Sequence, residues 1–191
     1  MTNPDFPVRE VLERLKSRIS VGGKHLTFPV PEREHYLEAI RVALRQPDHL
    51  GLHPCRVAII EDLEKLGKVL ARGAEALGAT PAEAEKAEAK AKKAPGLLAF
   101  IVRIDKHHPK VPQHEQWMTC GAFAGSILNA LELQGFSGKI VSGSSTAYPE
   151  VTAALCQPGE QVACWLMVGT AKEEQAVEES PDAEAFLSVW P

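Results

Sequence analysis

Basic and hydroxyl-bearing side chains recur in segments that also contain glycine or proline, where loops are expected. They belong to Arg18, Ser20, Lys24, Arg45, His49 and Ser142. Arginine forms charge-assisted, often bidentate hydrogen bonds with phosphate oxygens, and backbone N–H groups in glycine-bearing turns add further donors. The pattern therefore indicates a site for a phosphate-bearing ligand. For any one of these residues taken alone, an ordinary solvated side chain is the alternative.

Other kinds of chemistry are weakly marked in the sequence. It contains no G-x-G-x-x-G or Walker motif, no G-x-S-x-G elbow and no H-E-x-x-H motif. A metal-binding module could use His107, His108 and His114, but the first two are adjacent and no carboxylate or thiol joins them at ligand spacing. Asp48 and His49 could form an acid–base pair, although such residues more often cap loops. We predict no metal site.

The segment from Gln113 to Phe136 is the element around which the chain is expected to be organised. Its apolar and small residues recur at alternating steps of four and three, and most of its remaining surface is apolar as well. A helix that is apolar nearly all round must be buried. We therefore predict a central helix, against which the other elements pack or a second subunit docks.

The remaining pattern predicts one sheet covered by helices, in an α+β or α/β arrangement. Helices are expected over residues 8–19, 36–44, 63–77, 82–94 and 149–155, and strands over 55–61, 97–102, 138–141 and 161–168. At the start of the 82–94 helix, Thr80 and Glu83 have the spacing of a capping box, and Pro81 suits the first helical position. Since it has no apolar face beyond alanine, it should lie exposed, either as a connecting helix or as a lid.

Length, charge and composition narrow the class of protein. The 191 residues suit one domain, and a net charge of −4 gives no reason to expect nucleic-acid or membrane partners. The N-terminus lacks the apolar stretch of a signal peptide, so we expect a cytoplasmic protein. None of the four cysteines forms a C-x-x-C pair, which favours free thiols over a disulfide or metal framework.

Over nearly its whole length the chain resembles the flavin-dependent nitroreductase family, most closely its minimal, single-domain bacterial branch. Five segments in compatible order carry the resemblance: Arg18-Ile19-Ser20, the run 44–49, Leu52-His53-Pro54, the run 108–116, and Gln134 to Gly138 before Val141-Ser142-Gly143. It implies a nitroreductase-like α+β domain spanning residues 1–191, with a mostly antiparallel central sheet flanked by helices. It also implies a homodimer built on the long helix, with the tail 173–191 wrapping the partner subunit.

The same resemblance implies FMN bound at the dimer interface. Arg18 and Ser20, with Ile19 between them, would take the FMN phosphate, and Arg45 and His49 would approach the same flavin from the other subunit. The isoalloxazine would be lined, chiefly through backbone groups, by Ile140, Val141, Ser142 and Gly143. NAD(P)H would reduce the flavin, and a nitroaromatic, quinone or similar acceptor would then take the electrons in a ping-pong reaction. The flavin carries the chemistry, so no catalytic side chain is expected.

Three residues depart from the family pattern. Ile19 and Val141 stand where the family has arginines, and Cys55 stands where it has tryptophan. Lys24, Lys139 and Lys172 could replace the missing cations, or could be ordinary surface lysines. The alternative to an enzyme is therefore a non-catalytic member, in which an eroded flavin site binds another ligand or a protein partner.

Overall fold

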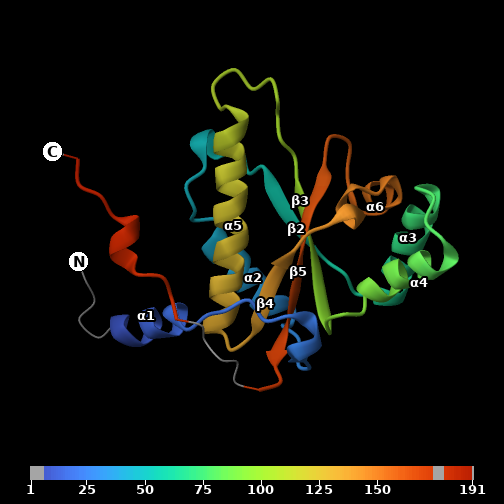
Figure 1. Cartoon of the computed structure of the whole chain (residues 1–191). Helices are drawn as coiled ribbons and strands as arrows, with labels where there is room; N and C mark the ends of the chain where they lie inside the picture. Colours follow the sequence, from blue (N-terminus) through green and yellow to red (C-terminus); the bar gives the residue numbers. More distant parts are fainter. Residues whose placement is uncertain (1–6, 174–178, 191) are drawn as a thin grey trace.

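The computed structural model describes residues 7–173 and 179–190, in which helices cover both faces of a five-stranded antiparallel sheet (Figure 1). The helices are α1 (Val8–Lys16), α2 (Arg33–Ala43), α3 (Leu63–Ala76), α4 (Pro81–Lys90), α5 (Gln113–Leu133) and α6 (Pro149–Leu155). The strands are β1 (Leu26–Thr27), β2 (Cys55–Ile59), β3 (Gly96–Val102), β4 (Ser137–Val141) and β5 (Gln161–Ala171). Short 3₁₀ turns are η1 (Gly23–His25), η2 (His49–Gly51), η3 (Ser144–Ala147) and η4 (Ala183–Phe186). The predicted α+β class is confirmed.

Strand β5 organises the sheet, because it pairs with β1, β3 and β4, while β2 lies beyond β3. All of these pairings are antiparallel. The sequence predicted that β5 ends at Gly169, but it continues to Ala171 because Thr170 and Ala171 pair with β1. A two-residue strand such as β1 is too short to show a periodic pattern, and it was not predicted.

The core lies on both faces of the sheet, as β3 makes clear. All seven residues of β3 are buried. Leu98, Phe100 and Val102 pack into the cluster that includes α5 and α2, whereas Leu97, Ala99 and Ile101 pack into the cluster on the α3 and α6 side. Alternate side chains therefore enter two separate apolar layers, which is why the strand reads as a continuous apolar run.

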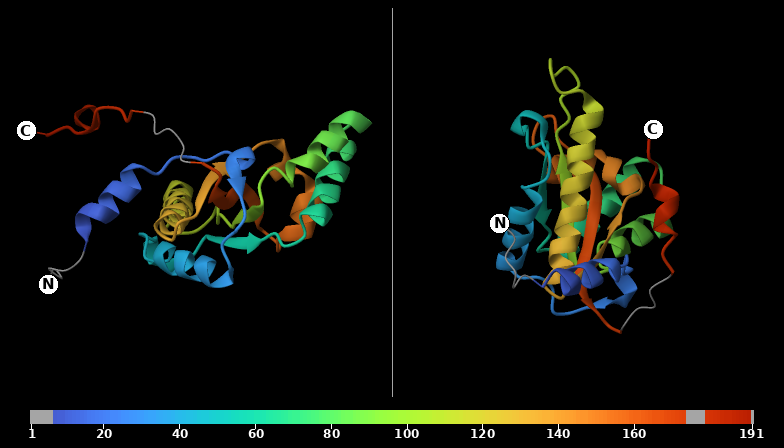
Figure 2. Two further views of the ribbon diagram at one scale, coloured as in Figure 1. Left: turned by 90° about the horizontal axis from the view of Figure 1, so that it is seen from below. Right: turned by 90° about the vertical axis from the view of Figure 1, so that its left-hand side faces the viewer.

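Helix α5 is buried along one face, formed by residues such as Cys120, Phe123, Ile127 and Leu131. The predicted burial of nearly its whole circumference is not found within one chain. Trp117 and Met118 are 41% and 70% exposed, because the sheet and α2 cover only one side of the helix (Figure 2). This open face could be covered by a second subunit. The dimer itself stays a prediction, because the structure describes one chain.

Helix α4 begins with the predicted capping box between Thr80 and Glu83. The prediction that this helix lies exposed is wrong for one of its faces, where Ala84, Ala87 and Ala91 are buried. The methyl groups pack closely on α3 because Gly67 has no side chain there: an added Cβ would lie 2.9 Å from Glu88 Cγ. Alanine is thus sufficient to bury this helix when glycine faces it.

The two ends of the described chain contribute little to the core. Helix α1 has no buried residue, and an ion pair of 2.8 Å between Arg14 and Glu132 joins it to α5. In residues 179–190, Phe186, Leu187 and Trp190 are 78–95% exposed. Residues 174–178 of the tail lie outside the described residues, so wrapping of a partner by the tail remains a prediction. No helix in the described part of the chain is long and apolar enough to cross a membrane.

Candidate functional site

The Arg18–Ser20 segment lies beside the first residues of β4. Ser20 forms a parallel bridge with Gly138, and the Val21 N–H donates to the Gly138 carbonyl over 3.2 Å. On its other side Gly138 approaches β5 closely, since an added Cβ would lie 2.5 Å from Met167 O. The segment predicted to hold a phosphate is therefore fixed to the strand that leads to the predicted ring-binding residues.

The other end of β4 brings Ile140 and Val141 to the loop that contains Ser142 and Gly143. Gly143 adopts φ +145°, a conformation open to glycine but not to other residues without strain. Its carbonyl accepts hydrogen bonds from the Thr146 N–H at 3.1 Å and hydroxyl at 3.0 Å. These bonds fix the loop without any ligand.

A cavity of about 210 Å³ opens beside this loop, and we call it the ring cavity. Val141, Ser142 and Gly143 line one side, and most of the rest is apolar: Leu66, Leu70, Leu97, Trp165 and Met167. Two cations, Lys90 and Lys93, also line it. Neither lysine was predicted from the sequence to belong to the site. The available signal was their place at the end of a helix that immediately precedes a buried strand.

Arg18 and Ser20 retain free binding capacity in this structure. The Arg18 side chain is half-buried, and its Nη1 donates only a long hydrogen bond of 3.4 Å to Ile19 O. Within residues 7–173 and 179–190, no carboxylate lies within ion-pair distance of Arg18. Ser20 is exposed. A cation and a hydroxyl are thus available together for an anionic group.

The side chains of Ile19 and Val141 pack into the protein. Ile19 packs against the cluster of Val21, Leu26 and Ala94, and Val141 packs against the cluster that includes Trp165. These two departures from the family pattern have therefore become parts of apolar clusters. At these positions a ligand would meet backbone groups and, at Val141, part of an apolar side chain that lines the ring cavity, but no cation.

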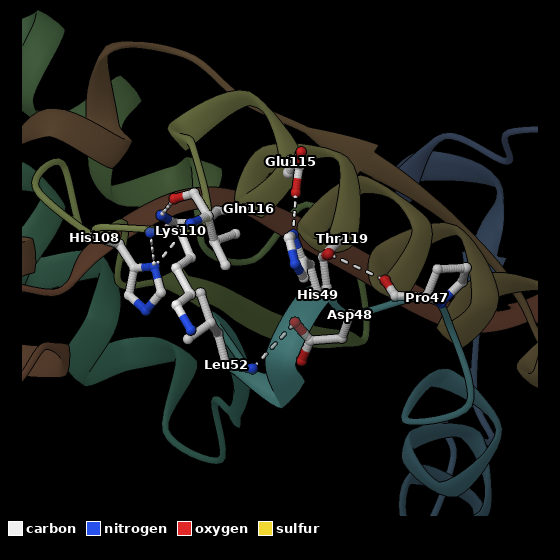
Figure 3. A network of polar contacts seen from close by, with 10 residues as sticks. Pro47, Asp48, His49, Leu52, His108, Lys110, Glu115, Gln116 and Thr119 are labelled. Carbon is white, nitrogen blue, oxygen red and sulfur yellow. Dashed lines mark hydrogen bonds and ion pairs between the residues drawn. The ribbon is translucent and has the colours of Figure 1, made fainter.

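His49 lies elsewhere, beside the first turn of α5 (Figure 3), and Arg45 directly follows α2 at the start of the same connection. His49 Nδ1 is 2.6 Å from Glu115 Oε2, and the Thr119 hydroxyl donates to Pro47 O over 3.1 Å. The segment of Arg18 and Ser20 meets the chain just after the opposite end of α5 (Figure 1). One chain therefore does not bring the two predicted groups together, and a contribution from a second subunit remains a prediction.

Two further positions have structural roles. The Cys120 thiol, which donates to the Pro54 carbonyl over 3.8 Å, neighbours the Cys55 thiol, and this neighbour together with burial raises the pKa of Cys55. Cys55 thus takes part in packing β2 on α5. His108 Nδ1 accepts hydrogen bonds from the backbone N–H groups of Lys110 and Val111, which makes it a loop-capping residue. Within the described residues no group of three or more His, Cys, Asp or Glu side chains gathers in a way that could hold a metal ion.

Comparison with known proteins agrees with this arrangement. Among solved structures, the nitroreductase-like family protein of Bacillus cereus matches with a TM-score of 0.76, at 17% identity over 100% of this chain and 98% of that one. The "FMN and NADPH-dependent nitroreductase NfnB" of Sphigopyxis sp. strain HMH matches with a TM-score of 0.70, at 15% identity over 94% of this chain and 98% of that one. These likenesses confirm the predicted fold.

The proteins that are similar in sequence align over the whole segment that contains the candidate site residues. "Putative NAD(P)H nitroreductase YdjA" of Escherichia coli K12 is 30% identical over 185 residues, which are 95% of this chain and 100% of that protein. The profile of the nitroreductase family matches residues 15–170, a range that begins just before Arg18 and ends beyond the loop at Gly143. The resemblance first drawn from five short segments is therefore confirmed, and the chain belongs to the nitroreductase family.

Proposed function

We propose that this protein is a homodimeric, FMN-dependent NAD(P)H oxidoreductase. One observation carries the proposal. Arg18 and the Ser20 hydroxyl, which have no strong partner, lie beside the start of β4, and a glycine-bearing loop and a cation-lined cavity lie at the other end of the same strand. At about 3.3 Å per residue, the five steps along the chain from Gly138 to Gly143 span about 16 Å. This spacing suits a ligand with a phosphate at one end and a planar ring at the other.

The residues present fit FMN. Arg18 and Ser20 would bind the phosphate, and the backbone from Ile140 to Gly143 would lie along the isoalloxazine. Lys90 and Lys93 at the ring cavity would stabilise negative charge near the ring. Ile19 would take part through its backbone alone, because its side chain is packed against Val21 and Leu26.

When bound, FMN would supply the redox chemistry, taking a hydride from NAD(P)H and passing electrons to a nitroaromatic, quinone or similar acceptor in a ping-pong cycle. The chain's own residues would bind the cofactor, orient it and exclude water from one side of it. This assignment is supported by the family and by the names of its relatives, which include an NAD(P)H nitroreductase and an FMN- and NADPH-dependent one. The expected location is the cytoplasm.

A homodimer would complete the site. It is supported by the uncovered face of α5, where Trp117 and Met118 are exposed, and by the apolar tail residues Phe186 and Trp190. It is also supported by the position of Arg45 and His49, which are too far along α5 to join Arg18 within one chain. In a dimer, these two residues would approach the flavin held by the partner subunit.

The first test is a visible absorption spectrum of the purified protein, recorded before and after addition of FMN and removal of the excess. We expect a flavin spectrum that bleaches under anaerobic conditions when NADH or NADPH is added. Failure to hold FMN would refute the proposal. Bound FMN that no nicotinamide reduces would instead favour a non-catalytic member of the family, for which the packing of Ile19 and Val141 into apolar clusters is the favouring observation.

A further inference from the structure

A second pocket, of about 410 Å³, lies between the η1–β1 segment and the connection from α4 to β3. Four cations line it, and we call it the lysine pocket: Lys24, Lys92, Lys93 and Lys172. None of the described residues that line it is acidic. Four ammonium groups around one hollow repel one another, so an anion bound there would be stabilised by each of them.

The contacts of these lysines hold the pocket together and leave charge available. Lys172 Nζ donates to Lys24 O over 2.7 Å, which joins the end of β5 to η1. Lys92 Nζ lies 2.5 Å from Glu64 Oε1, so this cation is partly neutralised. Lys24 and Lys93 have no ion pair among the described residues. At least two of the lining residues, Lys24 and Lys93, therefore carry a positive charge that no described carboxylate neutralises.

An aromatic ring belongs to the same pocket. Phe28 lines it and is 70% exposed, so its ring is open to a planar ligand. A ring beside several ammonium groups can hold a nucleobase and a phosphate at once. The chemistry of the pocket thus matches a phosphorylated nucleoside better than a simple inorganic anion.

The lysine pocket adjoins the ring cavity, because Lys93 lines both. The backbone of η1 packs directly on this residue: a Cβ added to Gly23 would overlap Lys93 O. A molecule with a reactive ring at one end and a phosphorylated nucleoside at the other could therefore reach from the ring cavity into the lysine pocket.

We propose that the lysine pocket binds the adenosine end of NADPH, with its 2′-phosphate among the lysines and its adenine on Phe28. The reductant is then NADPH in preference to NADH, which lacks that phosphate. This inference rests on the proposed function. The FMN phosphate has the same chemistry as the 2′-phosphate, but neither Arg18 nor Ser20 lines this pocket.

The test uses the full chain without flavin and measures binding of adenosine 2′,5′-bisphosphate and of 5′-AMP by calorimetry. The variant is Lys24→Gln/Lys92→Gln, because neither residue lines the ring cavity. The control is Lys106→Gln, the same kind of substitution at one exposed lysine in the turn between β3 and α5. Thermal melting checks that each variant is folded, and the FMN dissociation constant of each is measured separately.

We expect the wild type and Lys106→Gln to bind the bisphosphate at least about tenfold more tightly than 5′-AMP, the scale of charge-assisted hydrogen bonds to one phosphate. In the double variant this preference should fall to about twofold, with the FMN dissociation constant unchanged. Equal affinity of the wild type for the two nucleotides would overturn the inference. So would a double variant that loses FMN and keeps the preference, since the pocket would then hold the FMN phosphate.

The two proposals fail in different ways. A protein that binds no FMN refutes the flavoenzyme, and the NADPH assignment falls with it, even if the bisphosphate preference persists. A protein that binds FMN and shows no bisphosphate preference refutes only the lysine pocket. For the reconstituted protein, stopped-flow reduction should give a dissociation constant for NADPH that rises in the double variant, while that for NADH stays unchanged.

Discussion

His49 Nδ1 and Glu115 Oε2 are 2.6 Å apart, and this contact joins the loop after α2 to the first turn of α5 (Figure 3). The side chains of His49 and Glu115 are 49% and 38% exposed. Exposed pairs of this kind contribute about 1 kcal/mol or less to stability. The contact between His49 and Glu115 matters more for geometry than for stability, because the bond to Nδ1 fixes the orientation of the imidazole ring.

The first prediction is that Glu115→Gln weakens FMN binding more than it weakens the fold. We expect a rise in the FMN dissociation constant of about threefold to tenfold, because the neutral amide of Gln holds the His49 ring less firmly toward the flavin of the partner subunit than a carboxylate does. The free energy of unfolding should change by less than about 1 kcal/mol. Fluorescence titration with FMN and urea denaturation measure the two effects.

A double-mutant cycle with His49→Ala tests whether the two residues act together. The combined variant should bind FMN no more weakly than His49→Ala alone, because Glu115 acts through His49. Fully additive effects would contradict this role. Glu34→Gln is the matched control, since Glu34 is an exposed carboxylate on α2 with its own basic partner, Arg33.

The second prediction concerns the phosphate end of the site. Arg18→Ala should weaken FMN binding by about 1–3 kcal/mol, the scale of a lost charge-assisted hydrogen bond. Arg9→Ala on the exposed face of α1 removes the same charge outside the site and should leave FMN affinity unchanged. Both variants can be compared by the quenching of FMN fluorescence. Equal affinities would mean that the phosphate binds elsewhere.

Local patterns were sufficient to predict most of the elements. The capping box at Thr80 and the unbroken apolar run of β3 are features of short segments, and both are found as predicted. Helix α6 was predicted with the same limits that it has, Pro149 to Leu155, because proline suits the first helical position. Such features depend on neighbours in sequence, which is why a single sequence is enough to find them.

Features that depend on distant contacts were missed. The alanine face of α4 is buried only because Gly67 on α3 lets it approach, and no property of the 82–94 segment indicates this partner. Lys90 and Lys93 belong to the site because β4 ends beside α4 in space.

The third prediction is that Gly138→Ala destabilises the protein and disturbs the Ser20 segment. An added Cβ would lie 2.5 Å from Met167 O, a backbone atom of the neighbouring strand that cannot move alone. We expect a loss of about 2–4 kcal/mol, the range of strongly overpacked positions, measured by urea denaturation. Gly22→Ala is the control, because φ there is −68° and the nearest atom is 3.9 Å away. An equal effect of the two changes would show that the close approach at Gly138 is unimportant.

The fourth prediction concerns acid stability. The Arg56 guanidinium donates hydrogen bonds of 2.9 and 2.6 Å to Glu160, and these bonds lower the pKa of that carboxyl from its usual 4.5 to about 2. Because the folded pKa lies below the unfolded one, the stabilisation is complete above about pH 4.5 and is lost as the pH falls toward about 2.

Arg56 is partly exposed to solvent, which weakens the pair, so we expect about 1–2 kcal/mol to be lost over that range of pH. Glu160→Gln should lose this stability at pH 7 and should show a flatter decline below pH 4.5. Denaturation by urea at several pH values between 2.5 and 7 measures both effects. A wild type and variant with parallel pH profiles would show that Glu160 titrates normally.

The fifth prediction tests the proposed dimer through the uncovered face of α5. Met118 is 70% exposed on that face, so Met118→Lys would place a charge in a dimer interface built on α5. Light scattering should give twice the chain mass of 20.7 kDa for the wild type and the single mass for the variant. Leu77→Lys is the control, because Leu77 is 67% exposed after α3, away from this face. This variant should remain a dimer.

Met118→Lys should also lose FMN, since a lone chain keeps Arg18 but has no partner to bring Arg45 and His49 to the flavin. A monomeric wild type that still holds FMN would refute the shared site.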